Sequence, residues 1–132
     1  MIRLGLRENQ TTFHPGEPIA GAAIWDFPKA QESLEVRLVW STRGKGTEDG
    51  ATVAVQPLDA TQLAETGTFS LTAPDAPYSF NGTLIALIWA VEVVAAPSGE
   101  FERIEITIAP GGKEIALPRI AQPKTSGGIK MR

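Results

Sequence analysis

The chain has 132 residues, of which 12 are basic and 15 acidic, so its net charge is −3. It contains no cysteine and a single histidine, which excludes a disulfide framework, a thiolate nucleophile, a cysteine zinc site and a cluster of imidazole ligands within one chain. This length fits one domain with its own core, and 13 glycines and 10 prolines indicate many short elements joined by turns.

Alternation of apolar and polar residues dominates the chain, and this is the pattern of half-buried strands. In the first half it predicts strands near residues 2–6, 11–14, 19–27, 33–42 and 51–58. The turn dipeptide Pro15-Gly16 separates the second strand from the third. The polar, glycine-rich residues 43–50 form the expected hairpin tip, and Val53 and Val55 are predicted to share one face of the strand after it.

The second half continues in the same way. The pattern predicts strands over residues 62–73, 82–95, 101–108 and 113–117. Phe69 and Leu71 are expected on the inward face of the first of these, and the apolar composition of 82–95 on both faces suits a strand in the middle of a sheet. Residues 59–66 have a helical composition, with room for at most two turns.

About eight or nine strands separated by regular turn signals predict an all-β fold, a two-sheet antiparallel β-sandwich of immunoglobulin-like type. We expect one domain over residues 1–118 and a flexible basic tail over 119–132. The tail holds four cations and no acid, which leaves 8 bases against 15 acids in the first 118 residues. These four cations are the candidate partner-binding residues Arg119, Lys124, Lys130 and Arg132.

The charge distribution bears on the partners. An acidic body repels a phosphate backbone, so we expect no nucleic-acid binding by the domain. Two readings of the tail stay open, a solvated end and a docking segment for an acidic partner or an anionic membrane surface. The most apolar segment, 84–96, is shorter than the roughly 20 residues of a membrane-spanning helix and contains Glu92. The start of the chain lacks the apolar run of a signal peptide, so we expect a cytoplasmic protein with at most peripheral membrane contact.

Residues able to do chemistry are scattered. His14 stands at a turn with no second histidine or cysteine to join it. No segment has the spaced oxygen ligands of a calcium loop or the Gly-x-Ser-x-Gly pattern of a nucleophile elbow, and residues 43–46 lack the ending of a phosphate loop. We therefore expect no catalytic residue, no metal site and no cofactor.

Tryptophans offer an alternative function. Trp25, Trp40 and Trp89 would form a sugar-stacking platform if they faced solvent together. Trp40 and Trp89 fall within apolar strands and are expected in the core, whereas Trp25 precedes a strand end and is the one expected to be exposed. A carbohydrate- or small-ligand-binding β-sandwich module is thus the alternative function.

Two motifs resemble those of an arrestin-type N-terminal domain. Residues 13–24 are similar to that family's aromatic-x-Pro-Gly-Glu-x-hydrophobic-x-Gly run, and residues 77–82 to its Pro-x-Ser-Phe-x-Gly segment, which precedes an apolar strand. The apolar alternation of 34–40 stands between them where the family has such a strand, so the resemblance spans roughly residues 1–117. The residues that carry it are Pro15, Gly16, Glu17, Gly21, Pro77, Tyr78, Ser79, Phe80 and Gly82.

Each motif also has a physical role in the fold. Pro15 fixes φ and Gly16 permits a positive φ, as a tight turn between strands requires. Gly21 within a strand indicates a bulge or the close approach of another backbone. Tyr78 and Phe80 are expected to anchor an extended connection on the sandwich edge. We expect these residues to determine the fold rather than to react.

The resemblance implies a function without a reaction. Similar proteins include retromer's arrestin-like subunit, bacterial sporulation-control proteins and trafficking adaptors, so it implies an adaptor or regulatory module that binds proteins through a sheet edge or loops. Arrestins have two sandwiches and this chain has length for one. A second expectation is therefore that the chain pairs with itself or with a separate arrestin-like lobe.

Overall fold

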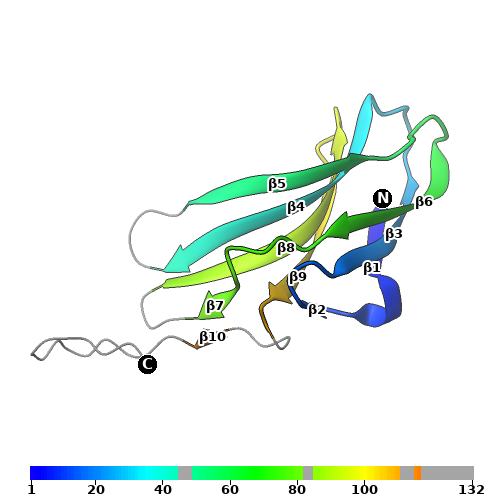
Figure 1. Cartoon of the computed structure of the whole chain (residues 1–132). Helices are drawn as coiled ribbons and strands as arrows, with labels where there is room; N and C mark the ends of the chain where they lie inside the picture. The colour runs from blue at the N-terminus through cyan, green and yellow to red at the C-terminus, as the bar shows by residue number, and fades with distance from the viewer. Residues whose placement is uncertain (45–48, 82–84, 111–114, 117–132) are drawn as a thin grey trace, which may run out of the picture.

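The computed structural model describes residues 1–44, 49–81, 85–110 and 115–116. These residues form two packed β-sheets (Figure 1) and, apart from the short 3₁₀ turn η1 (Arg7–Asn9), no helix. The strands are β1 (Ile2–Leu6), β2 (Thr12–Phe13), β3 (Pro18–Asp26), β4 (Ser33–Gly44), β5 (Gly50–Pro57), β6 (Ala64–Thr72), β7 (Phe80–Asn81), β8 (Ile85–Ala96), β9 (Phe101–Ile108) and β10 (Ile115–Ala116).

The first sheet has three antiparallel strands in the order β1-β3-β6. The second has the order β10-β7-β8-β4-β5, and β9 pairs with β8 further along the same side as β7. The strand β2 pairs in parallel with the end of β9. The strands β5 and β6 therefore end the two sheets on one side of the sandwich (Figure 1), and few contacts join them.

The core lies between the sheets and is filled from alternate positions of the long strands. Its large, fully buried side chains are Phe13, Ile19, Trp25, Leu34, Val36, Leu38, Trp89, Val91, Val93 and Ile108. This spacing of two residues within β4 and β8 is what the alternation in the sequence predicts. The prediction of an all-β two-sheet sandwich is confirmed.

The predicted strands agree with the structure to within a few residues at their ends. The inward positions of Phe69 and Leu71 are confirmed, as is the central place of β8, where Ala90 on the outer face is fully buried as well. Residues 59–63 form no helical turn, and β6 begins at Ala64. The two-residue strand β7 was not predicted, since two residues show no alternation.

The strand β5 departs from simple alternation. Its register with β4 shifts between Leu38 and Val39, where two steps on β5 match one step on β4, so Val53 is the extra residue of a β-bulge. Val53 and Val55 are both about half exposed, at 46% and 48%. The two side chains are therefore similarly exposed, and the bulge interrupts the regular alternation between them.

Three predicted features lie outside the described residues. They are the centre of the hairpin tip at 45–48, most of the last strand, and the basic tail. Among the described residues, no helix is long and apolar enough to cross a membrane.

Candidate functional site

The first motif forms a braced turn between β2 and β3. Gly16 has a φ of 85°, and the Glu17 N–H donates to the His14 carbonyl over 3.0 Å, as in a turn with proline and glycine at its centre. The Glu17 carboxylate accepts the His14 N–H at 2.8 Å and the Gln10 amide at 3.0 Å. These hydrogen bonds, the backbone one first, hold the pKa of Glu17 below its usual value. His14 itself is exposed at the turn.

Gly21 lies at the centre of the first sheet, opposite Leu6 in β1 and Phe69 in β6. A Cβ atom there would lie 2.2 Å from the Gly5 carbonyl oxygen and 2.8 Å from the Phe69 ring. The close backbone approach that a glycine in this strand predicts is present, and no bulge interrupts the register.

The second motif ties the connection before β8 to the end of β9. Ser79 is 2% exposed; its N–H donates to the Ile108 carbonyl at 2.8 Å, and its Oγ accepts the Ile108 N–H at 3.0 Å. The Pro77 carbonyl accepts the indole N–H of Trp89 at 2.9 Å. Phe80 packs against the core and Tyr78 is half-buried, while Gly82 lies outside the described residues.

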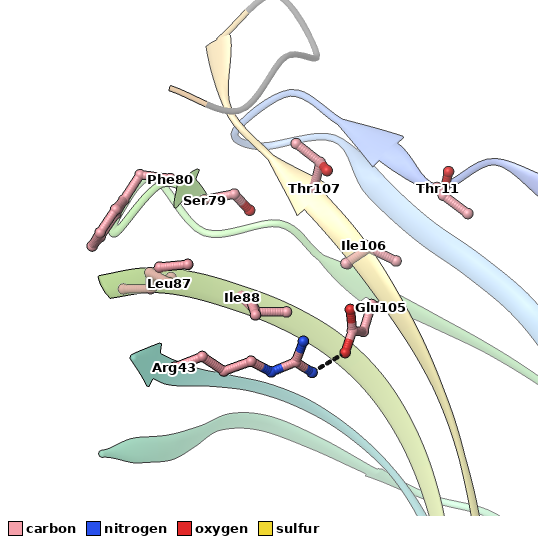
Figure 2. Close-up of a pocket in the computed structure, with 10 residues that line it drawn as sticks. Thr11, Arg43, Ser79, Phe80, Leu87, Ile88, Glu105, Ile106 and Thr107 are labelled. Carbon is pink, nitrogen blue, oxygen red and sulfur yellow. Dashed lines mark hydrogen bonds and ion pairs between the residues drawn. The ribbon is translucent and has the colours of Figure 1, made fainter. Parts of the chain in front are cut away.

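A small hollow of about 380 Å³ opens beside this connection, between the first residue of β7, which lies opposite Leu87, and the end of β9, where Ile106 lies opposite Trp89. Figure 2 shows Arg43 reaching from β4 across Ile88 to form an ion pair with Glu105 of β9. Because this guanidinium already has a carboxylate partner, the hollow offers no free cation from Arg43 to an anionic ligand.

Predicted ligand-binding residues do not form a site in the described part of the chain. Trp25 is 1% exposed, so the expectation that it faces solvent is wrong. Pairing of β3 with β6 continues beyond Trp25 to Asp26, which places the indole on the inner face, where its N–H donates to the Gln62 carbonyl at 3.2 Å. Trp89 is buried and Trp40 half-buried, as expected, so the three indoles form no exposed platform.

The described residues also contain no cluster of metal ligands, and the predicted partner-binding cations lie outside them. No group of three or more histidine or acidic residues converges among the residues that the structure describes. The four tail cations, Arg119, Lys124, Lys130 and Arg132, all lie outside those residues.

The open side between β5 and β6 is a stronger candidate, because two strand edges face solvent there. In an antiparallel pair, residues whose backbones bond each other alternate with residues whose N–H and C=O point away. The Phe27 N–H donates to the Leu63 carbonyl and the Ala73 N–H to the Glu17 carbonyl, both at 2.9 Å. The odd-numbered residues of β6 therefore bond to β3, and the even-numbered ones turn their backbone groups to the free edge.

The edge of β5 is protected against a further strand. The Leu58 N–H donates to the Leu34 carbonyl at 2.8 Å, so Val55 and Pro57 turn their backbones away from β4. Pro57 has no N–H to offer, and the bulge at Val53 twists the strand. Bulges and prolines are devices by which natural edge strands avoid pairing with another chain.

The edge of β6 lacks these devices. Its register with β3 runs without a shift from Thr72 to Ala64, and its sequence AETGTFSLT contains no proline, lysine or arginine. Side chains cover part of the edge. The Gln56 amide accepts the Ser70 N–H at 3.0 Å and approaches the Thr68 carbonyl at 3.5 Å, so it occupies the position of a partner strand's backbone. The sequence predicts an exposed sheet edge but does not identify the strand. Which residues of a strand turn their N–H and C=O groups to solvent depends on how that strand pairs with its neighbour in the folded sheet.

Comparison with known proteins supports the fold. No protein-family model and no curated protein sequence matches the chain. Among solved structures, it is similar to Spo0M, a sporulation control protein from Bacillus subtilis, with a TM-score of 0.56 and 13% sequence identity. The match covers 82% of this chain and 48% of the Spo0M chain, so the chain spans about half the length of that protein. The likeness is one of fold, and it supports the arrestin-like sandwich that the motifs predict.

Proposed function

We propose that this chain is a non-catalytic protein-interaction module, an adaptor or regulatory domain that binds an extended segment of a partner protein along the free edge of β6. The observation that carries the proposal is the contrast between the two edges of the open side. The edge of β5 is blunted by Val53 and Pro57. The edge of β6 is a regular nine-residue strand, and among the described residues only the side chains of Gln56 and Glu65 hydrogen-bond to its outward backbone groups. Backbone hydrogen bonds would supply the affinity, as in other cases of strand addition.

A proline substitution on the free edge tests this proposal. Thr68 turns its N–H away from β3, so Thr68→Pro removes an edge donor without removing a bond of the sheet. Thr52→Pro is the matched control, because Thr52 is also exposed and turned outward, but on β5. Proteins captured by the full chain from a lysate of its source cells are identified and purified. Each is then titrated against the unchanged chain, Thr68→Pro and Thr52→Pro.

We expect Thr68→Pro to weaken binding at least tenfold, because one or two backbone hydrogen bonds and the fit of the added strand are lost. Thr52→Pro should leave the affinity within about twofold, and far-UV circular dichroism should show that both variants are folded. A partner that binds Thr68→Pro as tightly as the unchanged chain would refute the use of this edge.

The partner of the edge could be a second copy of the chain or a separate arrestin-like lobe. This candidate is favoured by the length comparison, since Spo0M is about twice as long as the part that this chain matches. Light scattering over a hundredfold range of concentration tests self-pairing, which predicts a mass that rises from one chain to two. A constant monomer mass would refute it and leave a different protein as the partner.

The basic tail is a second proposed contact, for an acidic partner or an anionic membrane surface. Its support is the charge contrast between its four cations and the acidic body. Deleting residues 119–132 should weaken capture of such a partner in a salt-dependent way. Unchanged capture by the truncated chain would eliminate tail docking and leave the β6 edge untouched.

A further inference from the structure

A hollow of about 380 Å³ lies between the end of β5 and the middle of β6, next to the free edge. Its lining includes Pro57, Leu58 and Asp59 on the β5 side, Glu65 and Gly67 of β6 on the other side, and Trp25. At Gly67, a Cβ atom would lie 3.1 Å from the Trp25 ring and 3.5 Å from Leu58, so the apolar floor reaches the backbone of β6. The hydrogen bond from the Trp25 indole to Gln62 holds that floor in place.

A strand added at β6 would direct one of its side chains into this hollow. Side chains directly opposite each other in neighbouring strands lie on the same face of a sheet. Gly67 lies on the inner face of the first sheet, between the outward residues Thr66 and Thr68. The partner residue opposite Gly67 therefore points inward, where β6 itself contributes no side chain.

The rim of the hollow is acidic. The Asp59 carboxylate accepts the Thr61 N–H at 3.0 Å, and the Glu65 carboxylate accepts the Thr66 N–H at 3.2 Å. The bond from Thr61 holds the pKa of Asp59 below its usual value, so this group is charged at neutral pH. Neither carboxylate forms an ion pair with any cation in the described ranges, and no basic side chain lines the hollow.

We propose that the partner strand carries a lysine or arginine opposite Gly67, with its aliphatic stem on Pro57 and Leu58 and its charged head between Asp59 and Glu65. This inference rests on the proposed function and names the partner's chemistry at one position. Lysine and arginine suit such a place because their stems pack on apolar surface while the cation stays in water.

Selection from a displayed library of random ten-residue peptides tests the inference with the full chain. Peptides are selected on the unchanged chain, and those that also bind Thr68→Pro are removed, so the survivors depend on the β6 edge. The same selection is run on the double variant Asp59→Asn, Glu65→Gln, which keeps an acceptor oxygen at both positions. Glu102→Gln is the matched control, since it removes an exposed acid from β9 on the other sheet.

We expect lysine or arginine to be enriched at one position among edge-dependent peptides selected on the unchanged chain and on Glu102→Gln, and to lose that enrichment on the double variant. A synthetic peptide from this set should bind about three- to tenfold more weakly when its cation is replaced by norleucine, and the loss should shrink at 1 M salt. The same replacement should change binding to the double variant less than twofold.

The outcomes separate the two claims. Edge-dependent peptides without a preference for a cation, or with the same preference on the double variant, overturn the inference and leave the proposed function standing. If no selected peptide depends on the β6 edge, the proposed function fails and the inference fails with it.

Discussion

Replacing Gly21 by alanine should destabilise the sandwich strongly, whereas the same change at Gly5 should not. The added methyl group at residue 21 would meet the Gly5 carbonyl oxygen at 2.2 Å and the Phe69 ring at 2.8 Å. The ring can rotate aside, but the carbonyl belongs to the backbone of β1, paired with β3 in an unbroken register. The strand must therefore shift by about an ångström, since real Cβ atoms do not lie within 3.0 Å of such an atom.

The expected loss follows from that displacement. Overpacking a well-packed site costs about 1–3 kcal/mol, and the strained hydrogen bonds between β1 and β3 add to it, so we expect about 3 kcal/mol. With a urea slope of about 1.5 kcal/mol/M, the midpoint of unfolding should fall by about 2 M. At Gly5 no atom lies within 4 Å of the added carbon, so Gly5→Ala should leave stability unchanged or raise it by about 0.5 kcal/mol.

The assay is urea unfolding followed by tryptophan fluorescence and by far-UV circular dichroism on the unchanged chain and both variants. Coincident transitions would show that each unfolds in one step. The packing argument is refuted if Gly21→Ala unfolds at the same urea concentration as Gly5→Ala, because the backbone of β1 would then move without a measurable penalty.

Three further changes test separate contacts. Gln56→Ala uncovers the Ser70 N–H, so an edge-dependent peptide should bind about two- to fivefold more tightly by isothermal calorimetry; weaker binding would mean that Gln56 contacts the peptide rather than covering the edge. Ser79→Ala leaves the buried N–H of Ile108 without its side-chain acceptor and should cost about 1–3 kcal/mol in urea unfolding, while a change under 0.5 kcal/mol would show that the site relaxes. Because the folded-state pKa of Glu17 is lowered, its contribution to stability is present at neutral pH and is lost as the pH falls through the folded-state pKa. Glu17→Gln should therefore be less stable than the unchanged chain at pH 7 and equal to it at about pH 2, and a difference that does not depend on pH would contradict the role of the charge.

Much of the sandwich could be predicted from the sequence, because a strand with one buried face has to alternate. The apolar positions of β4 show this, and so does Gly21, whose place in the middle of a strand has a steric reason. Trp25 shows the limit. The turn residues that follow it indicate a strand end, yet pairing with β6 carries the strand past it and covers the indole.

The candidate site, the free edge of β6, could not be predicted from the sequence, because it depends on how the strands pair with one another. Which of β5 and β6 presents free backbone groups follows from the pairing order and from the phase of the hydrogen bonds. The bulge at Val53 is a shift in the register of β5 against β4, and the contact of Gln56 with β6 joins residues 14 positions apart in different sheets. Proline at position 57 is the one sign in the sequence that β5 is an edge.

The unequal protection of the two edges on the open side also limits the size of any assembly built there. If two copies pair through β6, each uses the same surface, and the contact is closed by a twofold axis. The edge of β5, with its bulge and its proline, does not offer a second surface for growth. An interaction of this kind should stop at two chains rather than extend into a fibre, and a partner strand on β6 would compete with it directly.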